Sequence, residues 1–298
     1  MISEPVDDQK VERQEPGPRG PAVEQRAGGN DRARRARQLL AGVTVADGLM
    51  VLIGLVAAVA RFSALGAQPL SPAEAEAALA SWQFARGATV VAPVASPAYF
   101  SLTSLVMAIG ATGDAAARLA PALIGTLTVL VPWLWRGRAN PAVWLATAAF
   151  LAASPLAMSL SRTAGGDALA LFALLLLAVA VLRLDEGPRW AALAGAALGL
   201  GLATTALFYT GLIAFIPAWW VFGGNDGRTS WRTLAAAAGL TFAVVATGSL
   251  FFPSGLGAAA QIVPAWLGQF GLPATGGALA VLAPILTLLR YEPALLFL

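Results

Sequence analysis

The stretch Arg32–Phe62, RARRARQLLAGVTVADGLMVLIGLVAAVARF, joins a cluster of arginines to a long apolar run. An apolar run of roughly twenty residues is long enough to cross the hydrocarbon core of a bilayer, which is about 30 Å thick. Positive charge beside a membrane span marks its cytoplasmic side. The stretch therefore predicts a first transmembrane helix over residues 39–60, preceded by a cytoplasmic segment.

Residues 1–37 differ in composition from everything that follows. They are rich in Glu, Asp, Arg, Gln, Pro and Gly, and they contain no aromatic residue. Such a segment cannot bury enough apolar surface to order itself. The sequence therefore predicts a disordered cytoplasmic tail over 1–37 and a transmembrane module over 38–298.

The composition excludes several classes of protein. The chain is 58% hydrophobic and 12% charged, with a mean hydropathy of +0.72, whereas a soluble domain carries about a quarter charged residues. It has no Cys and no His, which excludes disulfides, thiolate metal sites and Ser/His or Cys/His catalysis. The high pI does not indicate nucleic-acid binding, because the arginines flank apolar spans. Any chemistry must come from carboxylates, arginines, hydroxyls and the backbone.

The later apolar runs predict an all-α polytopic bundle. Their ranges are 97–112, 115–135, 141–160, 167–184, 190–222, 231–252 and 275–298. The run 190–222 is too long for one crossing, so we expect two spans joined by a turn near Ala206–Tyr209. The chain ends at Leu298 inside an apolar run, which favours a fragment or a shortened form.

The run 97–112 decides the topology. If it crosses the bilayer, six later arginines fall outside the cytoplasm; if it lies in the outer leaflet, they return to the cytoplasmic side, as the positive-inside rule favours. These arginines are Arg136, Arg138, Arg183, Arg189, Arg228 and Arg232. We therefore predict eight spans, with long outer segments over 61–114 and 253–274 and interfacial helices in the first of them.

Four carboxylates lie on the outer side in this topology, apart from Asp47 in the first span. They are Glu74, Glu76, Asp114 and Asp167. Charged groups at the edge of a bilayer are costly unless they are paired or hydrated, so they are candidates for function. Asp114 and Arg118 are four residues apart at the start of a helix, and an i,i+4 ion pair is the simplest expectation for them.

Glu74 and Glu76 lie at the start of a predicted helix. Ser71-Pro72-Ala73-Glu74 has the pattern of a capping box, with Ser at the N-cap, Pro at the first position and Glu at the third. Glu74 is therefore either a capping residue or a functional carboxylate. Glu76 lies on another face, where a solvated position is the simpler interpretation.

The segment Ser154-Pro155 through Ser161-Arg162 to Asp167 lies between two predicted spans. One interpretation makes Asp167 the N-cap of the next helix and Arg162 a side chain that reaches to the interface. The alternative places both, with the free amides of the helix start, at the mouth of a hydrated cavity that suits a phosphate or a hydroxyl nucleophile.

At these residues the sequence resembles the GT-C class of membrane glycosyltransferases, in particular the protein O-mannosyltransferases and the aminoarabinose-transferase (ArnT-like) proteins. The motifs are an outer loop over Leu70–Gly87, then Pro97-Ala98-Tyr99, Gly110–Gly113 and Arg118-Leu119 through Gly125, then Ser154-Pro155, Ser161-Arg162 and Asp167, and finally Arg290-Tyr291-Glu292-Pro293. They occur in the family's order over about 60–298, the family's N-terminal membrane module.

The resemblance implies transfer of a sugar from a polyprenyl-phosphate carrier to an acceptor hydroxyl on the outer face of the plasma membrane. Glu74 and Asp167 match its acidic sites, and Arg162 and Arg118 its outer cations; Glu76 is a further candidate for substrate binding. The reaction needs a carboxylate to take the acceptor proton, and cations or a divalent metal to hold the departing phosphate. No residues are assigned to a metal.

Two positions depart from the family pattern. Ala73 stands where the family's outer loop has an Asp that acts as the base, and Thr204-Thr205 stand where the aminoarabinose branch has a Lys. The sequence therefore leaves open a catalytically degenerate homologue that acts as a scaffold or subunit of a membrane assembly. A transporter is a third alternative, but the polar groups collect at the outer edge rather than near mid-membrane.

Overall fold

The computed structural model describes residues 44–90, 94–222, 230–248 and 250–271, and these residues form an all-α structure, as predicted. Within them are eleven α-helices and two short 3-10 helices. The α-helices are α2 (Val45–Phe62), α3 (Pro72–Ala85), α4 (Pro97–Ala108), α5 (Asp114–Leu130), α6 (Pro141–Ala153), α7 (Pro155–Arg162), α8 (Asp167–Val181), α9 (Pro188–Leu202), α10 (Ala206–Phe222), α11 (Trp231–Ala246) and α12 (Gly255–Gly271). The 3-10 helices are η1 (Val131–Trp135) and η2 (Leu184–Glu186). The predicted span 275–298 and the whole of the tail 1–37 lie outside the described residues.

The chain divides into two units, Met1–Gly48 and Leu49–Leu298. In the first unit the structure describes residues 44–48, where the first turn of α2 begins. The backbone N–H and the hydroxyl of Thr44 both donate to Asp47 Oδ2, at 2.9 Å each. Asp47 therefore stabilises the start of α2 rather than placing a charge in the middle of a span.

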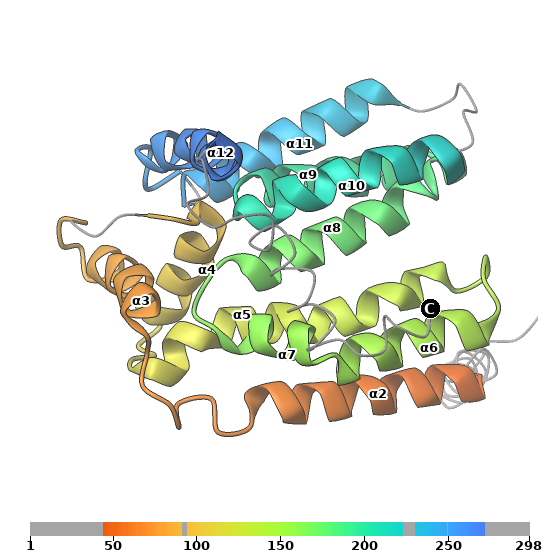
Figure 1. Cartoon of the computed structure of the whole chain (residues 1–298), viewed down its shortest axis with the longest axis horizontal. Helices are drawn as coiled ribbons and strands as arrows, with labels where there is room; N and C mark the ends of the chain where they lie inside the picture. Colours follow the sequence, from red (N-terminus) through yellow and green to blue (C-terminus); the bar gives the residue numbers. More distant parts are fainter. Residues whose placement is uncertain (1–43, 91–93, 223–229, 249, 272–298) are drawn as a thin grey trace, which may run out of the picture. The chain divides into compact units, whose positions relative to one another are not determined.

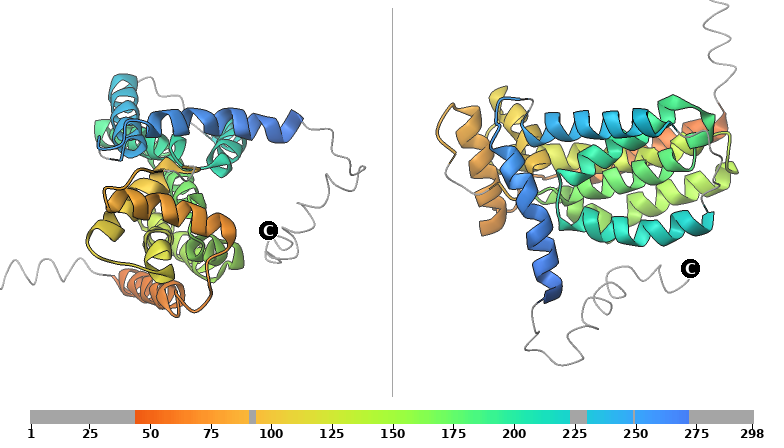
Figure 2. Two further views of the ribbon diagram at one scale, coloured as in Figure 1. Left: turned by 90° about the vertical axis from the view of Figure 1, so that its left-hand side faces the viewer. Right: turned by 90° about the horizontal axis from the view of Figure 1, so that it is seen from above.

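In the second unit most of the helices run side by side (Figure 1). At one end of this bundle, on the left in Figure 1, lie α3, α4 and α12, and the view from above shows α3 and α12 running across the other helices (Figure 2). We call this the outer end. At the opposite end lie the connections from α5 to α6 and from α8 to α9, which we call the inner end.

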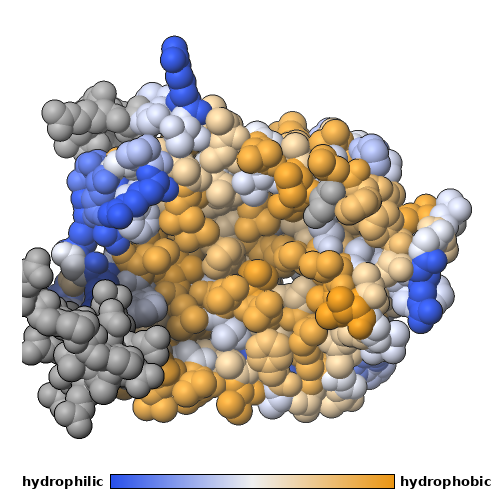
Figure 3. All heavy atoms as spheres, turned by 180° about the vertical axis from the view of Figure 1, so that it is seen from behind, coloured by the Kyte–Doolittle hydropathy of each residue, from blue (hydrophilic) through white to orange (hydrophobic). Residues whose placement is uncertain are grey.

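Two helical segments of the described residues are long and apolar enough to cross a membrane: α2, and the continuous stretch Asp114–Trp135 formed by α5 and η1. The pair α6 and α7, bent by 57°, is a third candidate if it counts as one span. Five further apolar helices are shorter, with 10–17 residues. One face of the molecule has hydrophobic residues across its middle and hydrophilic residues towards its two ends (Figure 3), as expected for a membrane protein.

Two predicted spans end or break at different places from those expected. The run 141–160 bends at Ser154-Pro155, because Ser154 Oγ accepts the N–H of Ala157 at 3.1 Å and Pro155 starts a new helix. The run 190–222 forms two helices, as predicted, but the turn lies at Ala203–Thr205, just before the position expected.

The helix α9 packs between α8 and α11 with very close backbones. A Cβ atom on Gly195 would lie 2.2 Å from the carbonyl oxygen of Leu234, and one on Gly199 would lie 2.3 Å from that of Ala238. Small residues of this kind allow helices to approach in membranes, where packing rather than the hydrophobic effect holds them together. This close packing holds α8, α9 and α11 together, and with them the start of α8 and the α9–α10 turn.

Candidate active site

Glu74 begins α3 with the predicted capping box. Its N–H donates to Ser71 Oγ at 3.4 Å, and the N–H of Ser71 donates to Glu74 Oε2 at 2.9 Å. The structure thus confirms the capping interpretation. It also gives Glu74 partners from two other segments.

Arg118 on α5 is the main partner of Glu74. Its Nε and Nη2 donate to the two carboxylate oxygens at 3.1 Å each, and the two side chains are only 7% and 13% exposed. The expected pair with Asp114 is therefore wrong, because Arg118 makes its two-pronged ion pair with a carboxylate 44 residues away. Its remaining donors bind the carbonyl oxygens of residues between α2 and α3, namely Leu65, Gln68 and Pro69. All five N–H groups of Arg118 are thus used.

Glu74 also reaches the loop after α7, where the N–H of Ala164 donates to Oε1 at 2.8 Å. Burial by itself favours the neutral acid, but the hydrogen bonds from Arg118, Ala164 and Ser71 outweigh it and lower the pKa of Glu74 to about 2. Glu74 is therefore ionised at neutral pH, and it joins α3, α5 and the α7–α8 loop.

Arg162 is the last residue of α7, and its side chain caps the C-terminal end of α2. Its Nη1 donates to the carbonyl oxygens of Ala60 and Ser63 at 2.7 and 2.8 Å, with a longer contact of 3.4 Å from Nη2 to Ala64. A cation at this position satisfies carbonyl groups that have no partner within the helix. Arg162 Nε donates to none of the described residues, and the side chain remains partly exposed.

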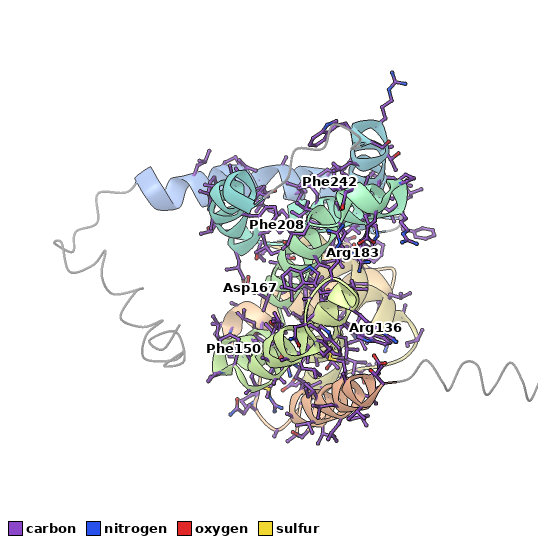
Figure 4. The ribbon with its side chains drawn as sticks, turned by 90° about the vertical axis from the view of Figure 1, so that its right-hand side faces the viewer. Arg136, Phe150, Asp167, Arg183, Phe208 and Phe242 are labelled. Carbon is purple, nitrogen blue, oxygen red and sulfur yellow. The ribbon has the colours of Figure 1, made fainter. Side chains whose placement is uncertain are left out.

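Asp167 is the first residue of α8, and not its N-cap as one of the two interpretations of the sequence had it, because Gly166 takes that position. The hydroxyl of Thr205, in the α9–α10 turn, donates to Asp167 Oδ1 at 2.7 Å. Asp167 is partly buried, and it lies in the interior of the bundle when seen along the helices (Figure 4). Among the described residues, Oδ2 has no hydrogen-bond donor.

Two cavities at the outer end share Glu74 as a wall. The first has a volume of 540 Å³ and is lined by Glu74, Arg118, Arg162, Gln68, Ser71 and Ser159 among others. The second has a volume of 360 Å³ and includes Asp167, Thr205, Tyr99, Ala73, Ser96 and Gly166 in its lining. Glu74, Ser159 and Thr163 line both. Glu76 is exposed and lines neither cavity.

The sequence did not reveal Arg61 or the role of Thr205. Arg61 ends α2, is only 1% exposed, and donates to the carbonyl oxygens of Ala57 and Leu151 at 3.3 and 3.0 Å. Gly125 leaves room for the buried side chain of Arg61, because a Cβ atom at this position would lie only 3.3 Å from Arg61 Nε. The sequence gives no signal for the burial of Arg61, and Thr205 stands out in it only as a departure from the family pattern.

The outer end does not fit a metal-binding set. In the part of the chain that the structure describes, no three acidic side chains lie close enough to hold a metal ion together. Of the two carboxylates that line the cavities, Glu74 already accepts from Arg118, Ala164 and Ser71, whereas Asp167 keeps one oxygen to which no described residue donates.

Comparison with known families decides the class of protein. Residues 91–251, more than half of the chain, match the family of dolichyl-phosphate-mannose-protein mannosyltransferases. The chain belongs to this family. Membership confirms the resemblance to the GT-C membrane glycosyltransferases, and it implies an enzyme class that uses a sugar carried on a polyprenyl phosphate.

The family match covers Arg118, Arg162, Asp167 and Thr205, whereas Glu74 lies before it. No curated protein and no solved structure matches the chain. The roles of the individual residues therefore have to be argued from the geometry of the outer end.

Proposed function

We propose that this protein transfers a sugar from a polyprenyl-phosphate donor to an acceptor hydroxyl on the extracytoplasmic side of the plasma membrane. The observation that carries the proposal is that Glu74 lines both outer cavities. The two cavities are thus neighbours, with a cation, Arg162, in the first and Asp167 in the second, where no described residue donates to Asp167 Oδ2. Such a pair suits an acceptor on one side of the sugar and a phosphate on the other.

Asp167 is the better general base of the two candidate carboxylates. A base needs an oxygen free to take a proton and a pKa not far below the working pH. Glu74 has a pKa of about 2 and hydrogen bonds to both oxygens, whereas Asp167 Oδ2 is free among the described residues. We therefore give Glu74 a positioning role, in which it holds the α7–α8 loop beside the sugar.

The reaction breaks one bond and forms one. The acceptor oxygen attacks the anomeric carbon, the bond from that carbon to the phosphate oxygen breaks, and the proton of the acceptor passes to Asp167. The polyprenyl phosphate leaves with the bonding electrons and one more negative charge. Arg162 has donors left over to stabilise this charge. Arg118 has none left and serves to position Glu74. Glu76 makes no contact with the described residues that supports a role in binding.

The proposed topology has the outer end outside the cell and the N-terminus in the cytoplasm, with eight spans in the module 38–298 and the tail 1–37 inside. Three helices at the outer end support it. The helix α4 has 12 residues and extends about 18 Å, the farthest from the hydrocarbon thickness of about 30 Å when compared with α8, α9, α10 and α11, which have 15–17 residues. The helices α3 and α12 run across the bundle, as interfacial helices do (Figure 2).

A catalytically degenerate homologue that acts as a scaffold is the second candidate. It is favoured by Ala73, which lines the second cavity at the position where the family has its acidic base. In this case the Glu74–Arg118 pair would keep the outer loop folded without serving catalysis. Transfer activity separates the two candidates.

The test is sugar transfer by the full chain in vesicles that contain polyprenyl-phosphate mannose. We expect the wild type to release mannose from the donor, and Asp167→Asn to lower kcat by about 10²–10⁴-fold, the usual contribution of a general base. Asp114→Asn is the matched control, because Asp114 is another outer carboxylate that lines neither cavity. An inert wild type would favour the scaffold, and equal activity of Asp167→Asn would remove Asp167 from the mechanism.

A further inference from the structure

A third cavity, of 680 Å³, adjoins the Asp167 cavity on the side away from Arg162. The two share Ala95 and Thr205 in their linings. The far wall comes from α12, and includes Gly257, Ala258, Gln261, Ile262 and Ala265. Three cavities therefore follow one another at the outer end, with Asp167 in the middle one.

The third cavity differs from the first in its chemistry. The first contains Glu74, Arg118 and Arg162. The third is lined by no charged side chain among the described residues; its polar side chains are Thr205, Ser254 and Gln261, and the others are apolar or small. A charged group placed there would find no side chain of opposite charge among the described residues.

Thr205 connects the third cavity to the base. It lines both cavities, and its hydroxyl donates to Asp167 Oδ1 at 2.7 Å. A hydroxyl group that enters from the third cavity thus meets the oxygen of Thr205 and the free oxygen of Asp167 together. This is the side from which a base accepts a proton, opposite the side of the leaving phosphate.

We propose that the third cavity binds the acceptor, and that the acceptor is an uncharged amphiphile: a lipid or glycolipid hydroxyl with an apolar body. This inference rests on the proposed function and adds the class of acceptor that the reaction uses. The neutral lining offers no opposite charge to a peptide with charged residues beside its hydroxyl. The hydroxyl and amide groups of Thr205, Ser254 and Gln261 provide hydrogen bonds for a polar head, and the apolar residues of α12 contact the body.

The donor's own polyprenyl chain is the competing occupant. The chain is joined to the phosphate, and the phosphate belongs beside Arg162 in the first cavity. The sugar would fill the middle cavity between them, so the chain would have to pass the sugar to reach α12. The order of the three cavities therefore assigns the third to the acceptor.

The test fills the third cavity without disturbing its walls. Gly257 lines the third cavity, and a Cβ atom there meets no atom within 4 Å, so Gly257→Phe adds bulk at this wall without a clash at Cβ. Gly239→Phe is the matched control, since Gly239 is a helical glycine on α11 with equally open surroundings. Each variant of the full chain is reconstituted with polyprenyl-phosphate mannose. Mannose transfer to dodecyl glucoside, transfer to a threonine peptide that carries charged residues, and hydrolysis of the donor by water are measured.

We expect wild type to use dodecyl glucoside and not the peptide. We expect Gly257→Phe to lower transfer to dodecyl glucoside at least about tenfold, equivalent to 1.4 kcal/mol of lost binding, while donor hydrolysis and the Gly239→Phe control stay unchanged. Gln261→Ala should weaken the same step more mildly.

Three outcomes would overturn the inference. Equal loss of hydrolysis and transfer in Gly257→Phe would assign the cavity to the donor's chain. Use of the charged peptide in place of dodecyl glucoside would make the acceptor a polar macromolecule. A wild type that neither hydrolyses the donor nor transfers the sugar would refute the proposed function itself, and the acceptor inference with it.

Discussion

Arginine–carboxylate pairs occur at both ends of the bundle, but in different environments. At the inner end Arg138 binds Asp185 and Glu186, and Arg183 binds Glu186 at 2.6 Å and lies over the ring of Trp190 at 4.0 Å. Arg183 and Glu186 are 14% and 21% exposed, but Arg138 and Asp185 are 36% and 48% exposed. The outer pair of Glu74 and Arg118 is 13% and 7% exposed. An arginine–carboxylate pair can thus be a solvent-exposed ion pair between two loops, as in Arg138–Asp185, or a buried part of a cavity wall, as in Glu74–Arg118.

The largest difference expected between the ends concerns stability. Arg118→Met leaves the Glu74 carboxylate buried without its cation, and we expect it to lower the free energy of unfolding by about 3 kcal/mol. Arg138→Met removes an exposed pair and should cost about 1 kcal/mol or less. Thermal unfolding of both variants in detergent measures the difference. Equal losses would mean that the outer pair is also solvated.

Lowering the pH should also weaken the outer pair, and the expected loss of unfolding free energy is smaller than that for Arg118→Met. The folded pKa of Glu74, about 2, lies below its ordinary value of 4.5. Its stabilisation is therefore fully present above about pH 4.5 and is lost as the pH falls through 2, and we expect it to amount to about 2 kcal/mol at neutral pH. Unfolding curves between pH 7 and 2 should fall for the wild type, and Glu74→Gln should be less stable at pH 7 but lack this part of the pH dependence. Parallel curves would contradict the assignment.

A third comparison concerns donor binding. Arg162→Gln removes the outer cation with spare donors, and we expect the KM for polyprenyl-phosphate mannose to rise about tenfold, as for the loss of one charge-assisted hydrogen bond. Arg189→Gln removes an inner arginine that is 76% exposed and should leave the KM unchanged. Because Arg162 also closes α2, the amount of folded protein is measured for both variants. A KM unchanged by Arg162→Gln would limit Arg162 to its structural role.

The smallest effect is expected at the inner end. Asp185→Asn should change the free energy of unfolding by less than about 1 kcal/mol, and this change should vanish in molar salt, since exposed pairs are screened. Donor hydrolysis by this variant should equal that of the wild type. A large loss of activity would show that the inner network controls the outer site.

Features of the fold that depend on neighbouring residues were predictable from the sequence. The start of α3 at Ser71 and Glu74 follows from a capping box, a pattern of four residues, and the two helices in 190–222 follow from length. The bend at Ser154-Pro155 had a visible signal, but the length of the apolar run favoured one straight span. The eight spans stay a prediction.

Contacts between distant segments were not predictable in this way. Arg118 had a carboxylate four residues away in sequence, yet its partner is Glu74, because the chain between α2 and α3 folds back over α5 and offers three carbonyl groups as well. The contact of Thr205 with Asp167 joins residues 38 apart. The grouping of candidate residues at one end came from charge placement, but the division of roles between Glu74 and Asp167 needed their hydrogen bonds.

The central claim is that the end with Glu74 and Asp167 faces the outside of the cell and the end with Arg138 and Arg183 faces the cytoplasm. The chain has no cysteine, so single cysteines can be introduced without a background. Ala88, after α3, and Ala142, at the start of α6, are both exposed and uncharged. With a membrane-impermeant thiol reagent on intact cells, we expect Ala88→Cys to be labelled and Ala142→Cys to be labelled only after the cells are opened. Labelling of Ala142→Cys on intact cells, with Ala88→Cys protected, would contradict the account.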